Sequence, residues 1–433
     1  MTAALPAQLS LWEATAVPGR PPTLLAGAHD TEVLVVGGGF AGLSCALHLA
    51  ERGIAVIVLE ADAVGSGASG RNGGQLLAGG RHTRDELIAL YGEAAGQRLH
   101  DFGAGAPDAA FALIRRLGLQ CEASQAGSIY AADNPAGLAE TQAKLKTLQA
   151  NGVDARWLDR EQIAEATGSR AYLGGYFNPQ GGSVQPLSLV RELVRAAVAA
   201  GAHVHEQSEA VSIERLGGDW QVRTAHGRVK ARRVLLATNG RPGELWPALE
   251  RTVLPVWSFQ VATDPLPESS GVLPGGATVS DTRRIVRYFR RDAAGRLVMG
   301  GKGTIRAPQG LQSFDVQRRA LARIYPQLAD APIRYWWGGQ VSVTLNRLSR
   351  FFTLGDNLFA TVACNGKGVA WNVALGPVLA DAMSGVPLDT LALPPARPLQ
   401  TIPFHFFKQA YTAAGSTWLR LRDGMDNASP AAT

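Results

Sequence analysis

Three glycines near the start of the chain have the spacing found in dinucleotide-binding sites. Residues 32 to 36 are almost wholly apolar, as expected of a parallel strand buried on both faces. Gly37, Gly39 and Gly42 follow, where glycine permits a tight turn, a close approach of backbone to a pyrophosphate, and close packing of the next helix. That helix, expected over 40–52, points its free amide groups at the pyrophosphate.

An acidic residue completes this motif. Glu60 lies 18 residues past Gly42, at the tip of a second strand expected over 55–59. A carboxylate in this position can accept hydrogen bonds from ribose hydroxyls. The residues expected to bind the dinucleotide in this part of the chain are Gly37, Gly39, Phe40, Ala41, Gly42, Glu60 and Ala61.

A glycine- and serine-rich segment at 65–75 indicates which dinucleotide binds. A simple NAD domain would begin another helix soon after Glu60, whereas this loop offers closely spaced amides and hydroxyls to a long, rigid ligand. A flavin ring, held at a fixed distance from its pyrophosphate, suits such a loop, so we predict FAD; the alternative is a flexible surface loop. The candidate FAD-binding residues here are Gly67, Ala68, Ser69, Arg71, Asn72, Gly73, Gly74 and Gln75.

Two later turns could lie beside the same cofactor. Ala237, Thr238 and Asn239 follow an apolar strand, and a cysteine-glycine turn precedes a helix expected over 368–384. A helix N-terminus preceded by Lys367 would stabilise the negative charge of a reduced flavin, although Lys367 could equally be a solvated loop lysine. The residues predicted from these segments, and from an alternating segment at 202–213, are Val211, Ala237, Thr238, Asn239, Gly366, Lys367, Gly368 and Val369.

An arginine-rich segment at 283–291 has two interpretations. On a strand, Arg284, Val286, Tyr288 and Arg290 share one face and the intervening residues share the other. We expect arginine stems on a half-solvated sheet; alternatively, one arginine holds a substrate carboxylate. Binding to nucleic acid is not favoured, because aromatic residues do not alternate regularly with the charges.

The composition bounds the class of protein. The 433 residues carry a net charge of +6 and are 46% hydrophobic, which agrees with a globular protein of two domains. No apolar stretch of about 18 residues is present, and residues 1–29 do not resemble a signal peptide. The three cysteines are far apart and lack metal-ligand spacing, so we expect no metal and a cytoplasmic location.

Several elements must position these residues. We expect helices over 83–117, 135–150 and 187–200, a strand pair at 220–224 and 229–236, and an antiparallel sheet between 258 and 343. The predicted domains are an N-terminal arm (1–29), a discontinuous α/β Rossmann-type FAD-binding domain (30–100, 180–242 and 345–392), a mainly antiparallel substrate domain (101–179 and 243–344), and a C-terminal arm and tail (393–433).

Taken together, these motifs resemble the D-amino acid oxidase superfamily of FAD oxidoreductases, most closely its gamma-glutamylputrescine oxidase and L-pipecolate oxidase branch. The resemblance is carried by Leu11-Trp12, GGGFAGLSCALHLAERG, VIVLEADAVGSGASGRNGGQL, DTRRIVRYFRRDAAGRLVMGG and CNGKGV, and covers nearly the whole chain. It implies FAD, a glutathione-reductase-like cofactor domain beneath an antiparallel sheet, and oxidation of a carbon–nitrogen bond to an imine. Oxygen or another acceptor would then reoxidise the flavin.

Two departures from the resembled enzymes matter. The stretch 339–344 lacks the cysteine that tethers FAD in sarcosine oxidases, which implies noncovalent FAD. The lysine that those enzymes place over the flavin to assist oxygen has no clear match here, because the nearby Lys302 does not align with its position. The identity of the electron acceptor therefore stays open.

For the chemical step we expect hydride transfer from the carbon next to a neutral amine to flavin N5, which needs a well-placed amine more than a strong base. The candidates for substrate or catalytic contact are Lys302, Tyr288, Arg287, Trp337 and Lys367. One alternative is a 2-hydroxy acid oxidase or dehydrogenase with a histidine base. Another is a non-catalytic flavoprotein of assemblies or membrane surfaces, suggested by the aromatic and basic segment 404–422. The sequence leaves the oligomeric state open.

Overall fold

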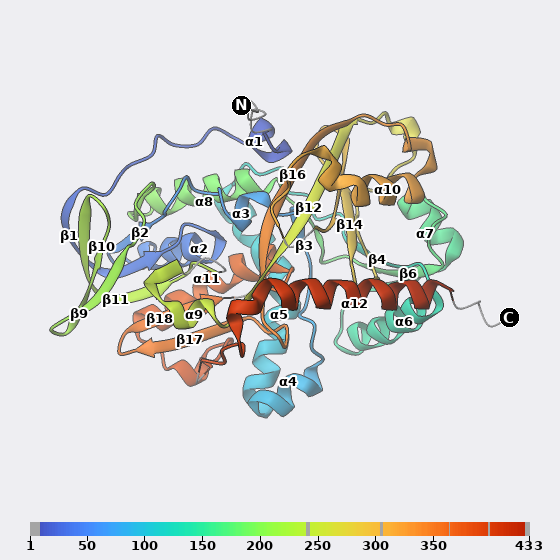
Figure 1. Ribbon diagram of the computed structural model, residues 1–433. Helices are drawn as coiled ribbons and strands as arrows, with labels where there is room; N and C mark the ends of the chain where they lie inside the picture. The colour runs from blue at the N-terminus through green and yellow to red at the C-terminus, as the bar shows by residue number, and fades with distance from the viewer. Residues whose placement is uncertain (1–8, 240–242, 304–305, 363, 397–398, 429–433) are drawn as a thin grey trace.

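Two large sheets, one parallel at its centre and one mainly antiparallel, lie side by side along the molecule (Figure 1). The structure is a computed structural model that describes residues 9–239, 243–303, 306–362, 364–396 and 399–428. The long helix α12 (Lys408–Ala428) runs across the front of the molecule in Figure 1, from its middle to the C-terminal side at the right.

The first sheet has the strand order β17-β18-β11-β1-β2-β8, and its five strands from β18 to β8 run parallel. A hairpin of β9 and β10 extends antiparallel from β11. Successive side chains on its central strands are buried on both faces, which explains their nearly unbroken apolar sequence. The strands are β1 (Gly27–Val36), β2 (Val56–Leu59), β8 (His203–His205), β9 (Ser212–Leu216), β10 (Asp219–Arg223), β11 (Gly227–Leu236), β17 (Arg350–Gly355) and β18 (Leu358–Val362).

The second sheet has the order β16-β12-β15-β14-β13-β4-β6-β5, with β13 and β4 as its parallel neighbours. A third, two-stranded sheet pairs β3 (Gln75–Leu76), which follows β2 in the chain, with β7 (Gly182–Ser183), which follows β6. The strands of the second sheet are β4 (Ser128–Ala132), β5 (Arg156–Leu158), β6 (Gly174–Asn178), β12 (Leu254–Pro265), β13 (Thr278–Asp281), β14 (Arg287–Arg291), β15 (Arg296–Lys302) and β16 (Ile333–Val343). The predicted combination of a Rossmann-type sheet and a mainly antiparallel sheet is confirmed.

Helices supply most of the remaining core. Buried side chains of α2, α5, α8 and α11 pack on one face of the first sheet, and those of α7 and α10 pack against the second sheet. The helices are α1 (Leu11–Thr15), α2 (Phe40–Ala50), α3 (Ala68–Arg71), α4 (Arg84–Tyr91), α5 (Glu93–Leu117), α6 (Pro135–Ala150), α7 (Arg160–Thr167), α8 (Pro186–Ala199), α9 (Pro247–Glu250), α10 (Asp315–Ile324), α11 (Gly368–Ser384) and α12.

The long helix expected over 83–117 is two helices. Gly92 ends α4 and precedes α5 with φ +82° and ψ 164°, a conformation that no residue within a helix adopts. The predicted domain boundary at residue 100 falls inside α5, whose Ala106, Phe111 and Ile114 pack with α2 and α11. Residues 101–117 thus share the core of the first sheet. The strands of the first large sheet lie within 27–59, 203–236 and 350–362, and those of the second lie within 128–178 and 254–343.

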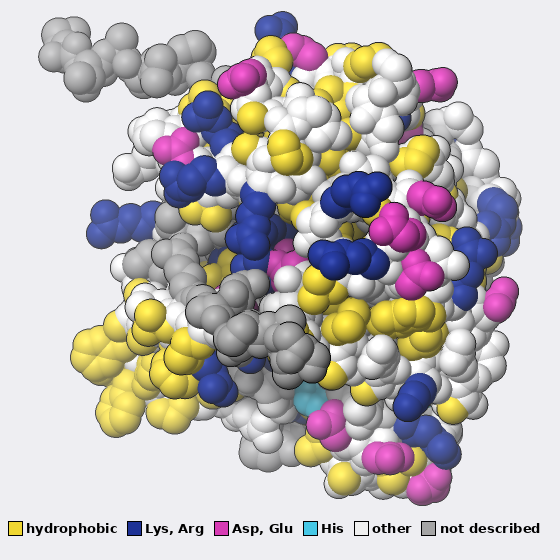
Figure 2. Space-filling model, turned by 90° about the vertical axis from the view of Figure 1, so that its right-hand side faces the viewer, with side chains coloured by type: hydrophobic (Ala, Val, Ile, Leu, Met, Phe, Trp, Pro, Cys, Tyr) yellow, Lys and Arg dark blue, Asp and Glu magenta, His cyan; other side chains and the backbone are white. Residues whose placement is uncertain are grey.

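The C-terminal segment, expected as an arm and tail, is largely the helix α12. Asp423 is buried and accepts hydrogen bonds from the backbone N–H groups of Arg284 (3.0 Å) and Ile285 (3.1 Å), which fixes α12 on the second sheet. Lys408 pairs with Glu250 at 2.6 Å at the other end of the helix. Figure 2 views the molecule from the end of α12 and shows Lys and Arg side chains around the middle of that face. None of the helices in the described ranges is long and apolar enough to cross a membrane.

Candidate active site

A cavity of about 1320 Å³ runs from the carboxyl ends of β1 and β2 to the face of the second sheet. At its first end Gly37 has φ +114°, and a Cβ atom there would lie 2.7 Å from the carbonyl oxygen of Ala237. A Cβ atom on Gly42 would lie only 2.1 Å from the carbonyl oxygen of Gly37, so α2 and β1 approach closely. Gly39 precedes α2 and has no side chain of its own to cap it, and the N-terminus of α2 borders the cavity.

Glu60 stands beside this turn, as the motif predicts. Its Oε2 accepts a hydrogen bond from the Gly38 backbone N–H at 2.7 Å, and the side chain lines the cavity. Burial raises the pKa of the Glu60 carboxyl, while hydrogen bonds from the backbone of Asp62 and Gly38 oppose that shift. The buried hydroxyl of Thr238, across the same cavity, has no hydrogen-bond partner among the described residues, which fits a polar ligand in this cradle.

The glycine-rich loop contains the short helix α3 and is held largely by its own side chains. Asn72 donates to the carbonyl oxygens of Ala68 (3.1 Å) and Ser69 (2.7 Å) and accepts from the Gly74 N–H at 2.8 Å. Ser69 Oγ accepts from the backbone N–H of Phe40 at 3.1 Å, which joins this loop to the start of α2. The alternative of a flexible surface loop is therefore wrong.

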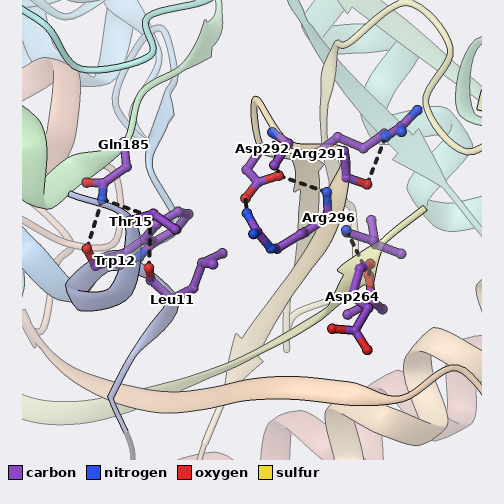
Figure 3. Close-up of polar contacts among 12 residues, drawn as sticks. Leu11, Trp12, Thr15, Gln185, Asp264, Arg291, Asp292 and Arg296 are labelled. Atoms are coloured by element: carbon purple, nitrogen blue, oxygen red, sulfur yellow. Dashed lines mark hydrogen bonds and ion pairs between the residues drawn. The ribbon is translucent and has the colours of Figure 1, made fainter. Parts of the chain in front are cut away.

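The N-terminal helix α1 fastens the same loop to the second sheet. The Trp12 indole N–H donates to the carbonyl oxygen of Asn72 at 2.8 Å, and its ring meets that of Trp337 edge-on, with centroids 5.4 Å apart. Gln185 at the start of α8 donates to the Trp12 carbonyl oxygen at 2.9 Å (Figure 3). Trp337 also donates to the Arg71 carbonyl oxygen at 3.1 Å.

The wall formed by the second sheet carries a tyrosine–serine pair. Tyr288 on β14 and Ser258 on β12 share a hydrogen bond of 2.8 Å between their hydroxyl oxygens. Burial raises the pKa of Tyr288 to about 12, so the phenol is neutral at physiological pH. A Cβ atom on Gly73 would lie 2.5 Å from the Tyr288 ring, which shows how closely the glycine-rich loop approaches this wall.

In the arginine-rich segment the expectation of half-solvated arginine stems is wrong for Arg283 and Arg290, which are buried, whereas the other arginines are half-buried or exposed. Arg290 is 2% exposed and donates to the carbonyl oxygens of Gly73 (2.9 Å) and Val184 (2.6 Å). Arg283 is 8% exposed and forms an ion pair with Asp133. These guanidinium groups hold backbone and carboxylate partners of the fold, because a charge this deep must be paired.

Two lysines among the candidates line the cavity. Lys302 ends β15 on the sheet wall, and Lys367 directly precedes α11. The Lys367 ammonium donates to the carbonyl oxygen of Ala78 at 3.1 Å and lies 5.7 Å from the centroid of the Tyr130 ring. Burial, reinforced by the nearby cations Lys144 and Arg81, lowers the pKa of Lys367 to about 7.

The structure brings most of the predicted residues to this one cavity. Arg287 and Trp337, proposed for substrate contact, do not line it, and Gly42 and Gly74 lie behind its wall. The guanidinium of Arg287 instead interacts electrostatically with the carboxylates of Asp281 and Asp133. The predicted residues that line the cavity are Gly37, Gly39, Phe40, Ala41, Glu60, Ala61, Gly67, Ala68, Ser69, Arg71, Asn72, Gly73, Gln75, Val211, Ala237, Thr238, Asn239, Tyr288, Lys302, Gly366, Lys367, Gly368 and Val369.

Sequence reasoning missed other parts of the wall. Tyr130 and Tyr176, on β4 and β6, stack with ring centroids 4.8 Å apart beside Lys367. Asp281 is also among the lining residues, and burial raises the pKa of its carboxyl to about 7. No local pattern marks these residues, because they meet only through strand pairing. Within the described ranges no cluster of side chains could hold a metal ion.

Known proteins of one family are similar to this chain over most of its length. Residues 32–382 match the DAO family, described as FAD dependent oxidoreductase. The chain is 34% identical over 347 residues to a probable oxidoreductase OrdL of Rhizobium meliloti, covering 78% of this chain and 79% of that protein. It is 31% identical over 402 residues to the gamma-glutamylputrescine oxidoreductase of Escherichia coli, covering 90% and 92%.

Solved structures share the fold at lower identity. A glycine oxidase from Geobacillus kaustophilus superimposes with a TM-score of 0.69 at 22% identity, covering 82% of this chain and 95% of that chain. An L-amino acid deaminase from Proteus myxofaciens gives a TM-score of 0.70 at 19% identity, covering 86% and 94%.

Proposed function

Because this chain belongs to the DAO family of FAD-dependent oxidoreductases and is an FAD-dependent amine or amino acid oxidase or dehydrogenase, we propose that it oxidises a carbon–nitrogen bond to an imine by hydride transfer. The observation that carries the proposal is the continuity of the cavity. The dinucleotide cradle at Gly37 and Glu60 opens without interruption onto the sheet wall at Tyr288. A substrate on that wall would therefore lie against the reactive end of the cofactor.

The bound flavin would supply the hydride acceptor, and the imine product would be hydrolysed by water. The residues of this chain would position the substrate and exclude water from the reacting atoms. The hydroxyl groups of Tyr288 and Ser258 form a neutral hydrogen-bonded pair on the cavity wall, which suits an uncharged amine. The N-terminus of α11 at Gly368 lies at the wall, where its dipole favours negative charge.

Histidine placement favours an amine over a 2-hydroxy acid. Oxidation of a hydroxyl group calls for a base to take its proton, and histidine is the usual one. All eight histidines lie within the described residues, and none of them lines the cavity. Hydride transfer from a neutral amine needs no such base.

We expect FAD to be held without a covalent bond. The stretch from Gly339 to Thr344 has no cysteine, and Cys45 and Cys121 are buried outside the cavity wall. The glycine turn, Glu60 and the α3 loop provide a polar cradle of the kind that holds a dinucleotide by hydrogen bonds alone. The reoxidant would be oxygen, yielding H2O2, or another electron acceptor.

Anaerobic flavin bleaching tests the proposal. Purified holoenzyme is mixed without oxygen with panels of amines, amino and imino acids, and 2-hydroxy acids, and flavin absorbance is followed. We expect bleaching by members of the nitrogen-containing panels; bleaching by hydroxy acids alone would contradict the proposal. Admission of air then reports on oxygen, and Lys302→Met should slow this step if Lys302 assists it.

One observation favours a second candidate, a flavoprotein that binds membrane surfaces. Aromatic side chains next to and along α12 are unusually exposed, with Phe404 at 67%, Phe406 at 74% and Trp418 at 58%. Amphipathic helices with such side chains can lie in a lipid interface. Flotation with vesicles, with and without the residues after Pro403, tests this candidate, and an unbound full chain would exclude it.

A further inference from the structure

We propose that the helix α12 closes the substrate chamber, the end of the cavity that the second sheet forms beside Tyr288, and that Leu419 on this helix limits the length of substrate that the chamber accepts. This inference rests on the proposed function and narrows its substrate class to compounds whose end remote from the flavin is apolar and fits beneath α12.

The first support is the position of Leu419. Its side chain is half-buried and lines the cavity, whereas the neighbouring Trp418 and Leu421 are 58% and 59% exposed. Thr412 and Asp423, which lie seven residues before and four residues after Leu419, are both buried. Since side chains at these spacings share one face of a helix, Leu419 lies on the face of α12 that packs on the protein.

The second support is the segment beneath that face. Residues 284–286, which lead from β13 into β14, line the same cavity. Asp423, one turn after Leu419, accepts hydrogen bonds from two backbone N–H groups of this segment. Because β14 continues from the segment to Tyr288, Leu419 lies at the substrate end of the cavity and not at the nucleotide cradle.

The third support is the chemistry of this end of the cavity. Leu419, Ile285 and Val286 give the wall three aliphatic side chains. The guanidinium of Arg284 in the same segment lies 3.5 Å from the Asp423 carboxylate, so these two charges offset each other. Each methylene group buried against such a wall strengthens binding about fourfold. An apolar substrate end is therefore favoured, up to the length at which it meets Leu419.

The fourth support is the way in which α12 is attached. Within the described ranges, no side chain of α12 belongs to the hydrophobic cores. Polar contacts anchor the helix near its two ends, namely the Lys408–Glu250 ion pair and the hydrogen bonds of Asp423. Segments with few buried apolar contacts open at a low free energy, so α12 lifts to admit substrate and returns. Asp423 is then the positioning residue that holds Leu419 over the chamber.

Thiol labelling tests the closure without turnover. Holoenzyme with Leu419→Cys or Leu421→Cys is treated with a bulky maleimide, and mass spectrometry of the α12 peptides measures each rate separately from the native cysteines. We expect Leu419→Cys to react at least about 10-fold more slowly than Leu421→Cys. Adding Asp423→Ala should speed the labelling of Leu419→Cys about 10- to 100-fold, as for loss of charge-assisted hydrogen bonds. Asp423→Asn, which keeps one acceptor oxygen, should give an intermediate rate.

Anaerobic flavin bleaching tests the length limit. Holoenzyme is mixed with unbranched primary amines and 2-amino acids of increasing chain length, and the rates of flavin reduction at low substrate concentration are compared. Leu419→Ala should raise the ratio of the rates for longer and shorter substrates about 10-fold or more, and Leu419→Trp should lower it. Leu421→Ala, on the exposed side of the same helix, should leave the ratio unchanged.

Two results would overturn the inference: equal labelling rates for Leu419→Cys and Leu421→Cys, or an unchanged length profile in both Leu419→Ala and Leu419→Trp. Labelling of Leu419→Cys that stays slow with Asp423→Ala would overturn the role of Asp423. If no nitrogen compound bleaches the wild-type flavin, the proposed function itself is rejected, and the labelling rates still report whether α12 closes the cavity.

Discussion

At Gly42 the helix α2 passes so close to β1 that a methyl group would lie 2.1 Å from the carbonyl oxygen of Gly37. Alanine at this position must push the helix away from the turn that holds the pyrophosphate. We expect Gly42→Ala to cost about 1–3 kcal/mol in local strain and to weaken FAD binding by about 5- to 100-fold. The flavin-to-protein ratio after purification, and a titration of apoprotein with FAD, measure this effect.

A matched control lies on α5. Gly105 is also helical, but no atom lies within 4 Å of the Cβ that alanine would add. Gly105→Ala should therefore retain full flavin and gain about 0.5–1 kcal/mol of stability. Full flavin occupancy in Gly42→Ala would show that the close approach is not required.

Site residues that are close together in sequence could be predicted from their spacing, whereas those that meet only through long-range packing could not. Gly37, Gly39 and Glu60 were found because strand, turn and helix follow directly in sequence. Tyr130 and Ser258 could not be found, since nothing near them in sequence marks a site. Arg287 and Trp337 were placed in the site on residue type alone, and the cavity does not reach them.

Among the elements, α1 is short but holds the cofactor loop in place. Trp12 is fully buried, donates to the Asn72 carbonyl oxygen and packs against Trp337 and the Arg290 guanidinium. We expect Trp12→Ala to lower the free energy of unfolding by about 3–5 kcal/mol and to weaken FAD binding, because the α3 loop loses its support. Urea denaturation of the holoenzyme and FAD titration measure the two effects.

Trp12→Phe separates packing from hydrogen bonding. It keeps an aromatic ring beside Trp337 but loses the indole donor, so the cost should be about 0.5–1.5 kcal/mol. Equal losses in both variants would mean that the hydrogen bond to Asn72, rather than the packing of α1, supports the loop.

Helices and strands could be predicted where the sequence around them carries local signals such as helix-favouring residues or caps. The helix predicted over 135–150 from its helix-favouring residues has the observed bounds of α6, which Asn134 caps and Pro135 opens. The helix α10 was missed inside a strand-rich region, since it packs on the second sheet through only a few apolar residues. Burial of Arg283 and Arg290 could not be predicted, because their partners come from distant parts of the chain.

At the scale of the whole molecule, the cavity lies between two separately packed cores, so a bound cofactor should stabilise both. With free FAD at about 1,000 times its Kd, linkage adds about 4 kcal/mol, which corresponds to a rise of roughly 4 °C in Tm for a chain of this length. Thermal unfolding of apoprotein with increasing FAD measures the rise, and Gly42→Ala should show a smaller one at equal FAD. Noncovalent binding further requires that acid denaturation release all of the flavin into solution. Flavin retained on the precipitated chain would contradict this, and would point to Cys364, the cysteine on the described cavity wall.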